Sequence, residues 1–107
     1  LFDLGADERL AVLIGDIRIS DHGYDEMSEE NILARDIVEG VLDGIVVEDY
    51  PTYAKGPCAL ILQLDHDRQP LHVVRGIPKD LSSPAVVVTA YRPDPDLWSD
   101  DFMRRKS

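Results

Sequence analysis

Two side chains suited to acid–base or phosphate chemistry lie in one apolar stretch, PLHVVRG, at residues 70–76. The imidazole of His72 titrates near neutral pH, and the guanidinium of Arg75 can pair with phosphate or carboxylate. Both groups are costly to bury unless hydrogen bonds satisfy them. His72 is therefore either a general acid or base held on a rigid strand, or a partly buried histidine that bonds to a neighbouring element. In the second interpretation, Arg75 reaches the sheet edge toward a helix carboxylate.

Four more residues could contact a nucleic acid. Tyr91 and Arg92 stand together in the segment TAYRP, where a ring can stack on a base and a guanidinium can pair with a phosphate. Tyr53 and Lys55 offer a second ring and a second charge in the segment PTYAKGP. A tyrosine at the end of a strand is also common in a core or at its rim. The pattern leaves both uses of Tyr91 open.

Metal and cofactor chemistry finds little support in the sequence. The histidines His22, His66 and His72 stand too far apart to form a local metal signature. The segment DHD at 65–67 carries two carboxylates and an imidazole, but it falls where a hairpin requires a polar turn, and a turn is the better interpretation. Cys58 is the single cysteine, which excludes a disulfide framework. We expect neither a metal nor a cofactor.

The charge of the chain is strongly negative and unevenly distributed. The 107 residues carry a net charge of −10, which would repel a phosphate backbone if it covered the surface evenly. Residues 1–51 hold 14 acidic and 3 basic residues, whereas residues 52–92 hold 3 acidic and 5 basic residues. These five basic residues are too few to form a broad nucleic-acid surface. The acidic half is either a solvated helical face or a surface that docks a basic partner.

Length and composition predict one domain over residues 1–107. We expect a folded core over 17–92 and a tail over 93–107 that Trp98 and Phe102 pin to the body. No apolar run approaches the roughly 20 residues that a membrane-spanning helix needs. The first residues lack the basic and apolar regions of a signal peptide, and these features together favour the cytoplasm.

The first half of the chain has the spacing of helices. Apolar residues at helical spacing predict a first helix over about 7–15. The segment RIS at 18–20 is expected to be extended. Ser20 and Asp21 can cap a short helix through HGYDEM, which follows them.

A longer helix is expected to follow. Ser28 can cap it, with acidic residues in its first turn. Its apolar stripe runs through Leu33, Ile37 and Val41. Gly44 suits a left-handed residue at its end.

The second half of the chain has the composition of strands. Apolar and β-branched runs occur at IVVEDY (45–50), CALILQL (58–64), LHVVRG (71–76) and AVVVTAY (85–91). The links between them are too short for helical crossovers, so the strands should form a meander. The predicted fold is α+β: two to three N-terminal helices on one face of a mainly antiparallel four-stranded sheet.

The chain resembles the bacterial domain-of-unknown-function family 4258, whose members are often encoded beside a zinc-finger, helix-turn-helix antitoxin. Five segments carry the resemblance in order: ISDHGYDEM, ENILARDIVEGVLDGIVVEDYP, CALILQL, RQPLHVVRG and VVVTAYRPDPDLW. It covers roughly residues 17–105, and sequences of this family resemble RelE and MqsR toxins. The resemblance implies a RelE-like fold, a cognate antitoxin as partner and a metal-independent ribonuclease of the toxin class.

The resemblance also suggests particular residues. The family's early His-Ala-x-x-Arg-Met pattern is met by His22 and Met27, while Glu26 stands where the family has arginine. The strand histidine is matched by His72, and the terminal Tyr-Arg-Pro begins at Tyr91. Loss of a cation at position 26 weakens the match to a nuclease.

In such a ribonuclease the RNA 2′-hydroxyl is itself the nucleophile. The resemblance then implies that His72 or His22 takes its proton and that Arg75 or Arg92 stabilises the charge on phosphorus. The candidates for RNA contact are Tyr91, Tyr53 and Lys55.

Two other classes of function stay open. The chain could be a toxin that blocks its target by binding alone. It could also be a non-catalytic interaction domain whose acidic helices dock a basic partner.

Overall fold

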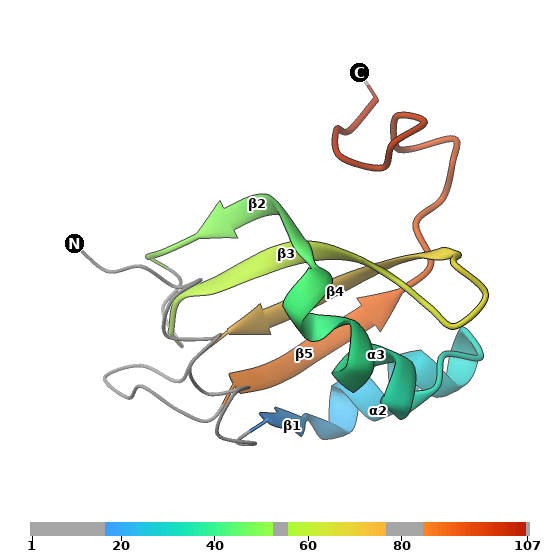
Figure 1. Ribbon diagram of the computed structural model, residues 1–107. Helices are drawn as coiled ribbons and strands as arrows, with labels where there is room; N and C mark the ends of the chain where they lie inside the picture. The colour runs from blue at the N-terminus through green and yellow to red at the C-terminus, as the bar shows by residue number, and fades with distance from the viewer. Residues whose placement is uncertain (1–16, 53–55, 77–84, 107) are drawn as a thin grey trace.

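The computed structural model describes residues 17–52, 56–76 and 85–106, and within them the apolar runs form one five-stranded sheet (Figure 1). The strands lie in the order β1-β5-β4-β3-β2. Their bounds are Ile17–Ile19 for β1, Ile45–Tyr50 for β2, Cys58–Leu64 for β3, Pro70–Gly76 for β4 and Ala85–Tyr91 for β5. The predicted meander is confirmed, because β2 to β5 pair antiparallel in chain order.

The prediction of four strands is wrong, because β1 adds a fifth strand at the edge. It pairs with β5 in parallel, with Ile17 opposite Ala85 and Ile19 opposite Val87, so the sheet is mixed. The extended conformation of RIS was predicted, but its pairing was not. A strand of three residues carries little pattern of its own, and its partner lies at the far end of the sheet-forming sequence.

Two α-helices lie within the described residues, α2 (Asp21–Glu29) and α3 (Ala34–Gly40), and a 3₁₀ turn, η1 (Val41–Asp43), follows α3. The predicted cap at Ser20 is confirmed: its Oγ accepts the N–H of Gly23 at 3.0 Å and donates to the carbonyl of Val88 at 3.0 Å. The helix predicted over 7–15 lies outside the described residues. Among the residues that the structure describes, no helix is long and apolar enough to cross a membrane.

The longer helix predicted to begin at Ser28 is wrong. Ser28 lies in the last turn of α2, which Asn31 ends with a left-handed φ of 56°. The N–H of Ile32 donates to the carbonyl of Met27 at 2.9 Å, and the N–H of Asn31 donates to that of Ser28 at 3.4 Å. This is the Schellman pattern of helix termination. Helix α3 then begins after Leu33 without a side-chain cap.

The left-handed conformation predicted for Gly44 is also wrong. Its φ of −67° and ψ of 148° are extended, and η1 ends the helical segment before it. Glycine is needed for a different reason. A Cβ at this position would lie 2.5 Å from Cγ2 of Ile61 and 2.8 Å from Nη2 of Arg75. The helical segment can therefore pass close to the sheet only with a hydrogen here.

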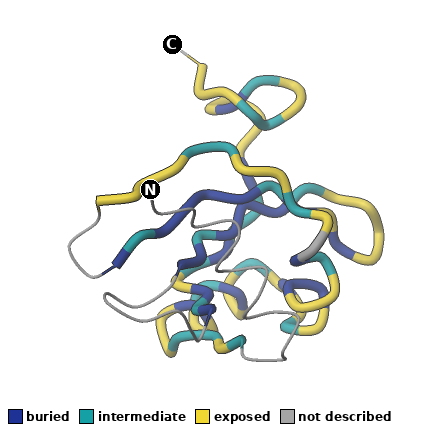
Figure 2. Tube along the Cα trace, turned by 60° about the vertical axis from the view of Figure 1, so that its left-hand side comes forward, coloured by how far each residue is buried: buried dark blue, intermediate teal, exposed yellow. Residues whose placement is uncertain are grey.

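The core lies between the two helices and one face of the sheet. Alternate residues of β4 meet apolar side chains of the helical layer, and β5 adds Val87 and Ala90, which are three positions apart because the register shifts between them. The cluster consists of Met27, Ile32, Ile37, Leu71, Val73, Val87 and Ala90. Figure 2 shows that the central strands are largely buried, whereas the edge strand β2 is mostly exposed or intermediate.

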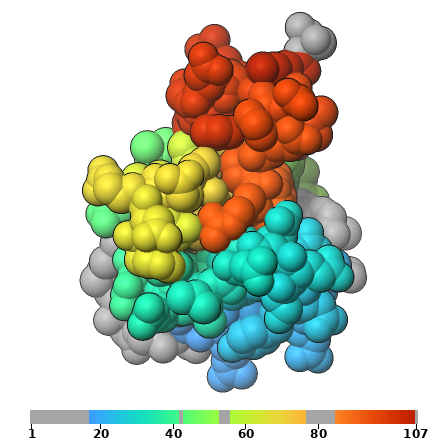
Figure 3. All heavy atoms as spheres, turned by 90° about the vertical axis from the view of Figure 1, so that its right-hand side faces the viewer, coloured from blue at the N-terminus to red at the C-terminus, as the bar shows by residue number. Residues whose placement is uncertain are grey.

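Residues 93–106, here called the C-terminal segment, form a tight loop beyond β5. The N–H of Ser99 donates to the carbonyl of Arg104 at 2.8 Å, and the N–H of Lys106 donates to that of Leu97 at 2.9 Å. Figure 3 shows the segment in orange and red above the helices and the turn between β3 and β4. Trp98 is 4% exposed and attaches the segment to the body, as predicted. Phe102, which was predicted to do the same, is only partly buried and contacts the body through its carbonyl oxygen, 2.8 Å from Nε2 of His72.

Candidate functional site

His72 lies on the central strand β4 and points away from the helices. Its neighbour Val73 packs in the core with Ile37, so the predicted alternation of the two faces is confirmed. The side chain of His72 is nevertheless 0% exposed. The C-terminal segment covers it on the face that the helices leave free.

Both ring nitrogens of His72 have hydrogen-bond partners. Nδ1 lies 3.3 Å from the hydroxyl of Tyr91 on β5, and Nε2 lies 2.8 Å from the carbonyl oxygen of Phe102. A carbonyl only accepts, so Nε2 carries the proton and Nδ1 accepts from the tyrosine. Burial lowers the pKa of His72, although the bond to Phe102 acts in the opposite direction. The imidazole is therefore neutral at pH 7.

A chain of contacts leads from His72 to the edge strand β2. The rings of His72 and Trp98 pack edge to face, with centroids 4.4 Å apart. The guanidinium of Arg105 lies over the indole of Trp98, 4.7 Å from its centre. Arg105 also pairs with Glu48 through two hydrogen bonds, from Nε to Oε2 at 3.2 Å and from Nη2 to Oε1 at 2.9 Å.

Tyr50 completes this arrangement, because its hydroxyl donates a hydrogen bond of 2.6 Å to Oε1 of Glu48. The bonds from Arg105 and then Tyr50 lower the pKa of Glu48, so its carboxylate is ionised at neutral pH. We call the set the His72 cluster. It consists of Glu48, Tyr50, His72, Tyr91, Trp98 and Arg105.

The two ends of the His72 cluster differ in their access to solvent. The side chains of Glu48 and Arg105 are 31% and 62% exposed, so a ligand can reach the ion pair. His72 is closed beneath the C-terminal segment. A substrate that meets the molecule in this state therefore contacts the carboxylate and the guanidinium first.

Most of the cluster was not predicted from the sequence. Glu48, Tyr50 and Arg105 had no assigned role, and Trp98 was assigned only to attaching the tail. Glu48 and Tyr50 are two residues apart on β2, and this spacing is a signal that both point to the same face. No such signal exists for Arg105, because its position depends on how the C-terminal segment folds back.

Arg75 points to the opposite face of the sheet from His72. It is 4% exposed, and its Nη2 donates to the carbonyl of Val41 at 3.0 Å, where α3 passes into η1. This contact is to a main-chain oxygen at the end of a helix, where a cation is favourable. Because the sheet separates Arg75 from His72, the two side chains do not face a common substrate.

Arg92 joins three parts of the molecule. Its Nη1 donates to Oδ2 of Asp65 at 3.0 Å, Nε to the carbonyl of Glu30 at 3.3 Å and Nη2 to that of Asn31 at 3.4 Å. These bonds tie the end of β5 to the loop after α2 and to the turn between β3 and β4. Arg92 therefore stabilises the packing of these three segments against one another.

The remaining predicted residues do not join the His72 cluster. His22 lies on α2 with its side chain 71% exposed, and its Nε2 is 3.4 Å from Oε2 of Glu26. Tyr53 and Lys55 lie outside the described residues. Among the predicted catalytic and RNA-contacting residues that the structure describes, Tyr91 alone is brought into contact with His72.

The DHD segment forms the predicted turn. Oδ1 of Asp65 accepts the N–H groups of Asp67 at 2.8 Å and of Gln69 at 2.9 Å. His66 turns toward the helical layer, where its Nδ1 lies 2.8 Å from Oδ2 of the buried Asp36. Within the described ranges, no group of three potential ligands is placed to hold a metal ion.

The His72 cluster combines groups that serve acid–base chemistry without a metal. An ionised carboxylate can accept a proton, a guanidinium can stabilise charge on a phosphate, and a phenol can relay a proton to the carboxylate that it contacts. The exposed ring of Tyr50 and the partly exposed ring of Tyr91 at its rim can pack against a planar ligand.

Fold and site define a small α+β domain with a cluster of ionisable and aromatic side chains on the helix-free face of its sheet. The family model described as domain of unknown function (DUF4258) matches residues 19–92, more than half of the chain. The chain belongs to this family. No curated protein and no solved structure matches the chain.

Proposed function

We propose that the chain is a toxin-type domain of RelE-like fold that cleaves RNA without a metal. The observation that carries this proposal is the Arg105–Glu48 pair at the rim of the His72 cluster, where a cation for phosphate adjoins a proton-accepting carboxylate. The family resemblance supplies the substrate class. It also favours a cognate zinc-finger, helix-turn-helix antitoxin as partner, while the single cysteine favours a cytoplasmic setting.

Arg105 takes the phosphate-binding role in this mechanism. Arg75 lies on the other face of the sheet, and Arg92 is held by Asp65 and two carbonyl groups. A phosphate that binds Arg105 competes with Glu48 for the guanidinium. The freed carboxylate can then accept a proton from the RNA.

The reaction needs no nucleophile from the protein. Glu48 accepts the proton of the 2′-hydroxyl, the 2′-oxygen attacks phosphorus and the bond to the 5′-oxygen breaks, while Arg105 stabilises the developing charge. The leaving 5′-oxygen takes a proton from Tyr50, which regains one from Glu48 through their 2.6 Å hydrogen bond. The products are a 2′,3′-cyclic phosphate and a 5′-hydroxyl.

His72 has a positioning role in the closed state. Its neutral ring holds the Tyr91 hydroxyl and the Phe102 carbonyl. Direct proton transfer from His72 requires that the C-terminal segment lift away, because the ring is 0% exposed. Tyr91, which is partly exposed, is the ring on which a base can stack.

Cleavage of a fluorescent RNA oligonucleotide by the purified chain in EDTA tests the proposal. The wild type should produce 2′,3′-cyclic phosphate ends. Glu48→Gln should lower the rate by roughly 100-fold or more, because it removes the general base. Glu29→Gln is the matched control, since Glu29 is exposed on α2 and outside the cluster, and it should leave the rate unchanged.

A second candidate function is a toxin or interaction domain that acts by binding alone. The complete burial of His72 and the bonds to both of its nitrogens favour this alternative. Growth and total-RNA integrity after induction in a bacterium separate the classes. Intact RNA would discard the nuclease; growth arrest would then indicate a binding toxin, and normal growth an interaction domain.

A further inference from the structure

The C-terminal segment is a folded unit that makes many of its hydrogen bonds within itself. The N–H of Ser99 donates to the carbonyl of Arg104 at 2.8 Å, and the N–H of Lys106 donates to that of Leu97 at 2.9 Å. Oγ of Ser99 also accepts the N–H of Arg104 at 3.1 Å. Figures 1 and 3 show the segment beyond the end of β5, apart from the helices. It can therefore move as one body without losing these bonds.

The contacts between the segment and the body centre on His72 and Glu48. The indole of Trp98 packs on the ring of His72, and the carbonyl of Phe102 accepts the proton of its Nε2 at 2.8 Å. Arg105 adds the ion pair with Glu48. The segment is therefore fastened to an imidazole and a carboxylate, and in the closed state it occupies both.

Phe102 has a strained backbone in this closed state. Its φ of 59° is left-handed, which is rare for a bulky residue. Its N–H donates to the carbonyl of Ser99 at 2.8 Å, and its carbonyl accepts from His72. Strain of this kind is concentrated at ligand clamps and switch regions. Lifting the segment would remove one of the two hydrogen bonds that maintain it.

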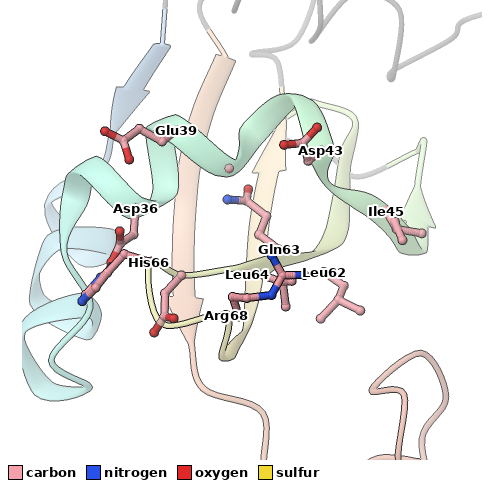
Figure 4. A pocket seen from close by; sticks show the side chains of 11 residues that line it. Asp36, Glu39, Asp43, Ile45, Leu62, Gln63, Leu64, His66 and Arg68 are labelled. Atoms are coloured by element: carbon pink, nitrogen blue, oxygen red, sulfur yellow. The ribbon is translucent and has the colours of Figure 1, made fainter.

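The face beneath the segment has the carboxylate and the imidazole on opposite sides of β3. Figure 4 shows Gln63 of β3 pointing toward α3 and η1, and Leu62 pointing away from them. His72 on β4 pairs with Leu62 and Glu48 on β2 pairs with Leu60, so both lie on the face of Leu62. Neighbouring strands are about 4.8 Å apart, which places β2 roughly 10 Å from β4. A single nucleic-acid strand that followed β3 would pass between the two groups.

The three basic residues of the segment stand together at its end, after its acidic residues at 94–101. Arg104, Arg105 and Lys106 are exposed, and neither Arg104 nor Lys106 forms an ion pair with a described residue. The side chain of Arg105 is 62% exposed where it meets Glu48. A phosphate that reaches Arg105 therefore weakens the ion pair that fastens the segment to β2, and the neighbouring cations add attraction.

We propose that the C-terminal segment is a flap that closes the His72 cluster in the resting protein and lifts when a single RNA strand enters beneath it. Phosphate draws Arg105 from Glu48, Trp98 leaves the ring of His72, and the strand lies between the segment and the sheet. Arg105 stays on the phosphate, so the proposed reaction keeps its charge-stabilising group while Glu48 and His72 become accessible. RNA as the occupant rests on the proposed function, whereas the opening rests on the contacts of the segment.

Labelling with diethyl pyrocarbonate, read at each histidine by mass spectrometry, measures the opening without RNA. The reagent acylates neutral imidazoles that solvent reaches. His22, whose side chain is 71% exposed, is the internal reference, and His72 of the wild type should react far more slowly. Trp98→Ala should raise the rate at His72 by about tenfold. Leu97→Ala should leave this rate unchanged, because Leu97 is 62% exposed.

A second pair of variants tests the ion pair without removing a large buried side chain. Glu48→Gln removes the charge that holds Arg105 and should raise the labelling rate of His72 about threefold. Asp49→Asn is the matched control. Asp49 is the next residue of β2, is exposed and points to the other face, so its replacement should leave the rate unchanged.

The affinity for a 2′-O-methyl RNA dodecamer tests which ligand lies beneath the flap. This oligonucleotide has no 2′-hydroxyl and cannot undergo the proposed reaction, so binding is separated from cleavage. If the closed segment blocks the site, Trp98→Ala should bind about fivefold more tightly than the wild type, because a larger fraction of the protein is open. Leu97→Ala should bind like the wild type.

Several results would overturn the proposal. Labelling of His72 that is no faster in Glu48→Gln and Trp98→Ala would show that the cover is permanent. Unchanged or weaker binding by Trp98→Ala, or no binding by either protein, would remove RNA as the strand beneath the flap. Tighter binding by Trp98→Ala while RNA of the same sequence stays uncleaved would support the flap and discard the nuclease.

Discussion

His66 and His72 have opposite environments although they are only six positions apart in the sequence. The carboxylate of Asp36 raises the pKa of His66 above its ordinary value of 6.5, because it favours the charged ring. Burial lowers the pKa of His72 below the same value. The pKa values of the two histidines are therefore shifted in opposite directions from 6.5.

NMR titration of the imidazole resonances should show His66 changing charge above pH 6.5 and His72 changing charge below it. For His72 the unfolded chain binds more protons than the folded one, so the stability that it contributes is lost as pH falls below 6.5. For His66 the contribution is present below 6.5 and is lost as pH rises through its folded-state pKa. The reverse order of the two titrations would contradict the geometry described for both rings.

At the scale of elements, the boundaries of α2 depend on two polar residues with different roles. Ser20 caps its start and bonds to Val88 of β5, so one hydroxyl joins the helix to the sheet. Asn31 ends the helix in a left-handed conformation. Ser28, which resembles a cap in the sequence, lies inside the helix.

Ser20→Ala should lower the free energy of unfolding by about 1–2 kcal/mol, because the N–H of Gly23 loses its acceptor. Urea denaturation followed by circular dichroism measures the change. Ser28→Ala is the matched control; Ser28 is exposed, and its replacement should change the free energy by less than about 0.5 kcal/mol. Equal losses in the two variants would show that Ser20 is not the cap.

At the scale of the whole molecule, the C-terminal segment determines which face of the sheet reaches solvent. It covers His72 through Trp98 and supplies Arg105 to the edge strand β2. The helices cover the other face. The accessible part of the His72 cluster therefore depends on one attached segment.

Trp98→Ala should detach this segment while the body stays folded, because the buried indole that packs on His72 and lies beneath Arg105 is lost. Hydrogen exchange by NMR should show faster exchange, by roughly tenfold or more, at the amides of Ser99, Phe102 and Lys106, while the amides of β3 and β4 stay protected. Leu97→Ala is the control, since Leu97 is 62% exposed. Unchanged exchange in Trp98→Ala would mean that other contacts hold the segment.

Local patterns in the sequence determined much of the fold. β-branched runs with short links determined β2 to β5 and their antiparallel order, because each link allows only a neighbouring strand. The alternation of His72 with Val73 followed from the period of a strand, and the cap at Ser20 and the turn at Asp65 followed from side chains that bond to nearby backbone.

Only the tertiary structure decided the site. The parallel pairing of β1, the cover over His72 and the Arg105–Glu48 pair all join residues far apart in the chain. Such contacts depend on how the elements pack, and no spacing rule along the sequence encodes them. The chemical character of His72 shows the same division: its residue type and strand were readable, but burial and hydrogen bonds decided its charge.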